Sequence, residues 1–141
     1  MTYLDLMADH HVMEALAQEL LDLTRAPAQQ IDAASDTLQM LAQAVRDHLA
    51  VEDPMLYATA IAADGSRHDG IVTATIDDLE ALKECWARYL YRWDRLHITR
   101  QWALFGEETR IMLEQLKDRV ARETAILYSL ALHHGVIQVG H

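Results

Sequence analysis

The chain has 141 residues, of which 51% are hydrophobic, and it contains only 5 Gly and 2 Pro, which favours one helical domain over a turn-rich β fold. A formal net charge of -10 argues against a surface for nucleic acid or anionic membrane, because such surfaces need clustered Lys and Arg. The single Cys85 rules out an intramolecular disulfide, and no apolar run approaches membrane-spanning length, so we expect a cytoplasmic protein.

A first helix is predicted from about Tyr3 to Leu23, because apolar residues recur there at steps of three and four. The same periodicity places His10 on the inward face and leaves His11 partly exposed. Taken alone, His10 reads as a core histidine that bonds to a neighbouring helix. Pro27 then predicts a turn over residues 24–30, since proline cannot continue a helix interior.

A second helix is predicted to begin near Ile31, and its inward face carries His48 and Glu52 at positions that the pattern otherwise gives to apolar side chains. The two side chains lie one helical turn apart on the same face. A buried, unpaired carboxylate is strongly unfavourable, so Glu52 needs a cation, a proton donor or a metal as its partner. Pro54 predicts a kink just after Glu52, because it removes a helical hydrogen bond.

A turn is predicted over residues 62–70, followed by a third helix whose inward stripe runs from Ile71 to Trp93. Extended backwards by one turn, this stripe reaches His68 and allows it to face inward. Cys85 lies in the middle of the helix and is expected to pack as a small apolar residue. Residues 95–100 are predicted to form a turn, with His97 at the surface.

The fourth helix is predicted over residues 101–133, with Arg119 and Glu123 on its core-facing stripe. Residues 118–128 partly echo residues 47–57: Asp, Ala, Glu, Leu and Tyr recur in register, and Arg119 stands where the earlier stretch has His48. The echo suggests that the two stretches face each other around a shared site.

Four amphipathic helices with short connections predict an all-α, antiparallel, up-down-up-down four-helix bundle, formed by a single domain over residues 1–141. This topology brings the inward polar residues of all four helices to one end of the bundle. They are His10, His48, Glu52, His68, Arg119 and Glu123. Mixed imidazole and carboxylate ligands suit non-haem iron, manganese or zinc, so the pattern predicts a metal site in this layer.

The chain resembles the hemerythrin-like, HHE cation-binding family. The matching motifs are Asp9-His10, then His48-Leu49-Ala50-Val51-Glu52 followed by Met55-Leu56-Tyr57, then His68, and finally Glu123 followed by Ile126-Leu127-Tyr128. The resemblance implies a four-helix bundle with a carboxylate-bridged di-iron site that binds dioxygen or senses iron, oxygen or redox state. It also implies that His10, His48 and His68 are terminal ligands and that Glu52 and Glu123 bridge the metals.

Arg119 departs from this family pattern, which has a histidine one turn before the last carboxylate. Two alternatives follow. Arg119 extends its head away from the metals and leaves a site for a single metal or for two weakly held ones. In the other alternative its guanidinium pairs with Glu52 and Glu123 and replaces the metal with an internal ion-pair network.

The leading interpretation is a hemerythrin-like iron protein, with di-iron or a single metal, that senses or binds oxygen, iron or redox state and is not an enzyme. The alternative is a metal-free helical bundle that acts as an interaction or regulatory module with a protein partner or as a homodimer. The end of the bundle opposite the polar layer is expected to hold Trp86, Trp93, Trp102, Tyr89 and Tyr91. Candidates for such a contact are Tyr89, Tyr91 and Trp102, and the alternative is that these rings fill the core. A third interpretation, a peroxidase or nitric-oxide-handling enzyme, rests only on the versatility of di-iron chemistry.

Overall fold

The chain folds into helices alone over the part that the structure describes. This computed structural model describes the backbone of residues 3–26, 28–65 and 70–133 and the side chains of residues 7–26, 28–50, 77 and 80–125. The described chain forms five helices: α1 (Tyr3–Arg25), α2 (Ile31–Gly65), α3 (Gly70–Arg92), α4 (Arg95–Arg100) and α5 (Trp102–His133). No strand occurs among these residues, which confirms the all-α prediction.

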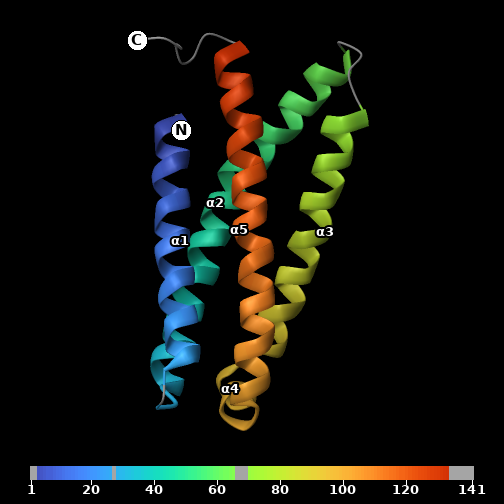
Figure 1. Ribbon diagram of the computed structural model, residues 1–141. Helices are drawn as coiled ribbons and strands as arrows, with labels where there is room; N and C mark the ends of the chain where they lie inside the picture. The colour runs from blue at the N-terminus through green and yellow to red at the C-terminus, as the bar shows by residue number, and fades with distance from the viewer. Residues whose placement is uncertain (1–2, 27, 66–69, 134–141) are drawn as a thin grey trace.

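The four long helices run alongside one another and alternate in direction (Figure 1). α1 packs against α2 and α5, and α3 packs against the same two helices. The start of α1, the end of α2, the start of α3 and the end of α5 therefore lie towards one end of the molecule, and α4 closes the other end (Figure 1). None of the described helices combines the length and apolar character needed to cross a membrane.

The boundary between α1 and α2 follows residues in the sequence that end or begin helices. α1 ends at Arg25, two residues before Pro27, and α2 begins at Ile31 with Asp32 in its first turn, where the helix dipole favours a negative charge. α2 continues through Pro54 to Gly65. Figure 1 shows the second half of α2 leaning away from α1, and that half contains the proline that removes a helical hydrogen bond.

The prediction of a plain turn over residues 95–100 was wrong, because this stretch forms the short helix α4. Asp94 caps it: the backbone N–H of His97 donates to the Asp94 carboxylate at 2.9 Å, and this hydrogen bond lowers the pKa of Asp94. Ile98 is fully buried and anchors the helix in the core. His97 is exposed, as the sequence predicted.

Among the described side chains, the core contains members of the apolar stripes that the periodicity predicted, with an aromatic cluster near α4. Trp93 and Phe105 pack with ring centroids 5.3 Å apart, and Trp102 adds a third ring 5.9 Å from Phe105. Higher in the bundle, the Tyr89 hydroxyl lies 2.6 Å from Thr109 Oγ1, and burial raises the pKa of Tyr89. These rings pack in the interior, which agrees with the alternative that aromatic residues at this end fill the core.

Tyr91 and Cys85 are among the side chains of α3 that face the solvent. Tyr91 is 91% exposed. Cys85 is exposed as well, so the expectation that it packs as a small apolar residue was wrong. Cys85 precedes the buried Trp86 in the helix and is therefore turned about 100° away from the core stripe. Its sulfur accepts a weak hydrogen bond from Arg88 Nη2 at 3.7 Å.

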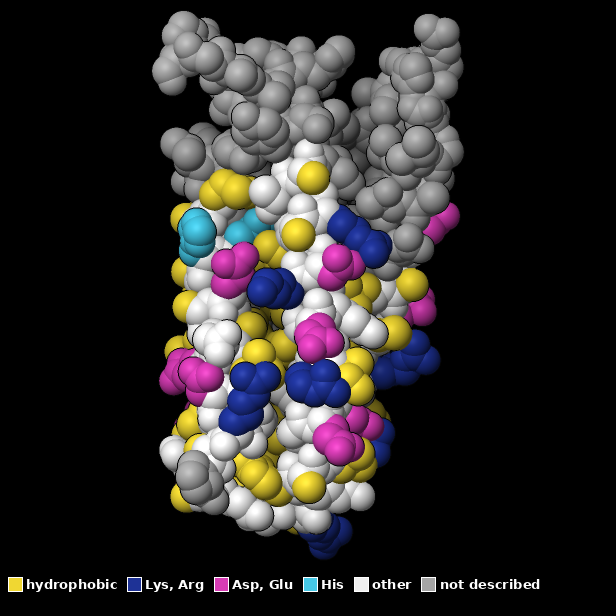
Figure 2. Space-filling view, viewed as in Figure 1, with side chains coloured by type: hydrophobic (Ala, Val, Ile, Leu, Met, Phe, Trp, Pro, Cys, Tyr) yellow, Lys and Arg dark blue, Asp and Glu magenta, His cyan; other side chains and the backbone are white. Residues whose placement is uncertain are grey.

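The face formed by α1 and α5 carries charges of both signs (Figure 2). Along α5, Arg110 pairs with Glu114 at 3.2 Å and Arg122 pairs with Asp118 at 2.9 Å, both one helical turn apart. Acidic and basic side chains are interspersed on this face, and no large basic patch appears there (Figure 2). The face therefore lacks the clustered cations that a nucleic-acid surface needs.

Candidate metal centre

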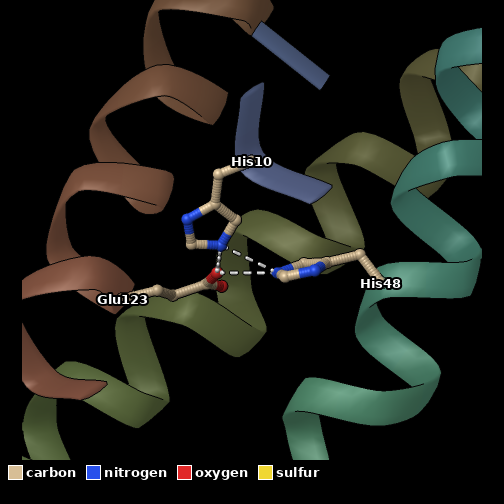
Figure 3. Close-up of side chains that lie close together, drawn as sticks. All are labelled: His10, His48 and Glu123. Carbon is tan, nitrogen blue, oxygen red and sulfur yellow. Dashed lines mark hydrogen bonds and ion pairs between the residues drawn. The ribbon is translucent and has the colours of Figure 1, made fainter. Parts of the chain in front are cut away.

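Three potential metal ligands from three helices meet inside the molecule. His10 comes from α1, His48 from α2 and Glu123 from α5, and their side chains point towards one another (Figure 3). They are 3%, 2% and 1% exposed, respectively. Each lies on the inward stripe of its helix, so the same periodicity that builds the core also delivers these polar groups to one place.

The distances between the three ligand atoms fit one small cation. His10 Nε2 lies 3.0 Å from His48 Nε2, and Glu123 Oε2 lies 3.7 Å from the former and 3.6 Å from the latter. A point equidistant from three atoms with these separations is about 2.0 Å from each, and bonds from zinc to nitrogen or oxygen are about 2.0–2.2 Å long. The residues therefore fit a divalent transition-metal ion without rearrangement.

The orientation of His10 is set by Thr124. The Thr124 hydroxyl donates to the carbonyl of Val120 at 2.8 Å, so its oxygen is available to accept a hydrogen bond from His10 Nδ1 at 3.1 Å. With the proton on Nδ1, the lone pair of Nε2 points towards His48 and Glu123. Histidine ligands in metal sites are commonly held this way by a second hydrogen bond.

His48 has an acidic neighbour on its outer side. Its Nδ1 lies 3.5 Å from Asp9 Oδ2, and the Asp9 side chain is 39% exposed. Without a metal, one of the two Nε2 atoms donates a hydrogen bond to the other at 3.0 Å. With a metal bound, the Asp9 carboxylate would favour a proton on His48 Nδ1 and leave the lone pair of Nε2 facing inward. Asp9 directly precedes His10, so two adjacent residues of α1 contribute to the centre, one as a candidate ligand and one as its support.

Arg119 belongs to the centre and does not turn away from it. Its Nε donates a hydrogen bond to Glu123 Oε1, one helical turn along α5, and the Arg119 side chain is buried. The two oxygens of Glu123 therefore have different neighbours: Oε1 contacts the guanidinium, whereas Oε2 faces the two imidazoles. The contact with Glu123 is the part of the ion-pair alternative that the structure describes, whereas the Glu52 side chain lies outside the described residues.

A small cavity of about 10 Å³ adjoins the centre. His48, Arg119 and Glu123 form its polar wall, and the rest of its lining is mostly apolar: Met13, Val45, Leu49, Leu82, Lys83, Trp86, Leu116 and Val120. This volume is about that of one water-sized ligand. Trp86 was expected at the opposite end of the bundle, yet it lines this cavity.

Two predicted site residues fall outside what the structure describes. Glu52 lies in the backbone of α2 one turn after His48, but its side chain is outside the described residues, and His68 is outside them altogether. Thr124 and Asp9 were not predicted to support the histidines. Asp9 stood in a quoted motif next to His10, whereas Thr124 has no periodic signal and emerges only from the packing of α1 against α5.

The sequence as a whole matches one known family model. The model of the hemerythrin HHE cation-binding domain matches residues 2–131. No curated protein and no solved structure matches the chain significantly. The matched range includes all three residues of the candidate centre.

Proposed function

Because the chain belongs to the hemerythrin HHE cation-binding family, we propose that it is a non-haem iron protein that binds the metal through His10, His48 and Glu123. Two imidazoles and one carboxylate form a ligand set that suits non-haem iron(II). The identity of the metal as iron is part of this proposal.

The observation that carries the proposal is the convergence of three buried donors from three separate helices. A core histidine usually needs one hydrogen-bond partner, whereas here two imidazole nitrogens and a carboxylate oxygen face a common point. The outer nitrogen of each ring has a polar neighbour: His10 Nδ1 lies 3.1 Å from Thr124 Oγ1, and His48 Nδ1 lies 3.5 Å from Asp9 Oδ2. Polar neighbours behind the ring are typical of metal-binding histidines.

The proposal includes the finer architecture of the family. The four long helices would form one antiparallel four-helix bundle that comprises a single domain, and Glu52 and His68 would complete the ligand set. The position of Glu52 one turn after His48 supports its inclusion, because side chains four residues apart share a helical face. His68 is included only because it lies one helical turn before the inward-facing stripe predicted for the third helix.

We place the role of the metal in binding or sensing oxygen, iron or redox state. Iron, when bound, supplies redox chemistry and affinity for small ligands such as dioxygen. The chain itself holds the ligands in a buried layer, and the adjoining cavity has room for about one water-sized molecule. This restricted space supports binding of a small ligand over turnover of a larger substrate.

A second candidate function is favoured by the contact between Arg119 and Glu123. A guanidinium can neutralise a buried carboxylate without a metal, and such a chain would serve as an interaction or regulatory module. The exposed Tyr91 on α3 would then be a candidate contact for a protein partner or a second copy.

Metal content separates the two functions. Protein purified without oxygen and then incubated with iron(II) is expected to retain iron after dialysis, and His48→Ala is expected to lose most of it. His10→Ala should behave like His48→Ala. The matched control is His11→Ala, because His11 is the next residue on α1 but is exposed and lies off the centre. Absence of iron from the wild-type chain would reject the metal proposal and favour the metal-free module.

A further inference from the structure

We infer that Arg119 limits the centre to a single metal ion, so that it acts as a specificity-determining residue for metal number. The inference rests on the proposed metal-binding function and goes beyond it, because that function alone leaves open whether one ion or two are held. It is carried by the unequal surroundings of the two Glu123 oxygens.

The two oxygens of Glu123 are not equivalent. A carboxylate that bridges two metal ions uses one oxygen for each ion. Here Oε2 faces His10 and His48, but Oε1 accepts a hydrogen bond from Arg119 Nε. Because Oε1 is already bonded to a cation, Glu123 presents one oxygen to metals and serves as a ligand to one ion.

The positive charge of Arg119 also opposes a second ion. Two metal ions in a shared site are usually about 3.5–4 Å apart. A second ion near Oε1 would meet the guanidinium, which is always protonated and here is buried with little water to screen it. Arg119 and Glu123 lie one turn apart on α5, so the helix itself keeps the guanidinium close to this oxygen.

The space beside the centre is small as well. The cavity beside His48, Arg119 and Glu123 is about 10 Å³ in volume. It has room for about one water-sized group, so the described side of the centre leaves little space for a second ion together with a water ligand. The three described ligand atoms, in contrast, already match the distances around one ion.

The test is the number of ions bound per chain. Wild-type protein is incubated with excess manganese(II), dialysed to equilibrium and analysed for metal, and its electron paramagnetic resonance spectrum is recorded. One ion per chain and the spectrum of an isolated manganese ion are expected. Arg119→His and Arg119→Gln are expected to bind a second ion, and the paired ions should broaden or couple the spectrum.

Two controls make the result specific. Arg119→Lys keeps the cation and should stay at one ion per chain. Arg122→His adds a histidine on the same helix but at an exposed position, and it should also stay at one ion. Circular dichroism of every variant verifies that the helices are retained.

The outcomes are distinguishable. Two ions in the wild-type chain would overturn this inference and leave the proposed function intact. No ion in the wild-type chain would overturn both. If the wild-type chain and both neutralising variants all hold one ion, Arg119 does not set the number and the inference is likewise overturned.

Discussion

Thr124 accepts a hydrogen bond from Nδ1 of His10 at 3.1 Å, although the two residues are 114 positions apart in the sequence. The contact joins the beginning of the chain to α5 and orients an imidazole towards the candidate centre. The Thr124 hydroxyl donates its own proton in a hydrogen bond to the Val120 carbonyl one turn earlier, so its oxygen serves as the acceptor for His10.

Replacing Thr124 with valine should weaken metal binding while the helices remain folded. Valine has a similar shape but cannot accept a hydrogen bond from His10, so the ring loses the bond that sets its tautomer. We expect a loss of roughly 10- to 100-fold in metal affinity, which is the usual effect of removing such a partner. Competition with a metal-binding dye measures it. Thr124→Ser keeps the hydroxyl and should stay near wild type; equal weakening by serine would contradict the explanation.

Arg119→Met should destabilise the metal-free protein. Methionine retains part of the apolar volume but leaves the buried Glu123 carboxylate without its guanidinium, and breaking a buried ion pair on one side costs about 3–5 kcal/mol. Urea unfolding of metal-free protein provides the measurement. The double variant Arg119→Met, Glu123→Leu removes both charges and should recover most of the lost stability. A single variant as stable as wild type would mean that the pair contributes little.

The stability of the protein should decline at alkaline pH through Tyr89. Burial raises the pKa of Tyr89 in the folded chain above its value of about 10 in the unfolded chain. Its contribution is therefore complete below pH of about 10 and is lost as the pH rises further, because ionisation favours the unfolded chain.

Tyr89→Phe is expected to flatten this alkaline decline. It should also cost about 1 kcal/mol at neutral pH, because the hydrogen bond to Thr109 is lost. Unfolding measured over a pH series tests both effects. Tyr91→Phe on the same helix is the matched control, since Tyr91 is 91% exposed and should leave the pH profile unchanged.

Gly106→Ala should stabilise the protein. Gly106 lies inside α5, and a methyl group there would lie 3.7 Å from Thr24 Cβ, which is ordinary contact. Alanine restricts the unfolded chain and has the higher helix propensity, so a gain of about 0.5–1 kcal/mol is expected. Thermal unfolding measures it. Ala87→Gly, at an exposed position in the interior of α3, should give a loss of similar size.

Periodicity alone predicted the parts of the molecule that repeat. His10, His48 and Glu123 were assigned inward from three- and four-residue spacing, and all three are buried. The same argument placed Arg119 in the core. Where the structure describes their surroundings, these residues do meet, because helices of this length must align their stripes to bury them.

Features that depend on single contacts were not predictable in this way. The helix α4 is too short to show periodicity, and it forms because Asp94 caps it and Ile98 anchors it. Cys85 directly precedes a core position of α3, and an error of one residue in the predicted helical register is enough to change its side chain from buried to exposed. Thr124 owes its role to the packing of α1 on α5, which a one-dimensional pattern does not contain.

The candidate ligands come from widely separated parts of the chain. His10 and His48 are separated by 38 positions, and Glu123 comes from the far end of the chain. An ion held by all three would act as a cross-link that closes long chain segments and reduces the freedom of the unfolded chain, much as a disulfide does. Gain or loss of the ion would then tighten or release α1 against its neighbours, and a change in metal supply would become a change in how firmly this end of the molecule is tied together.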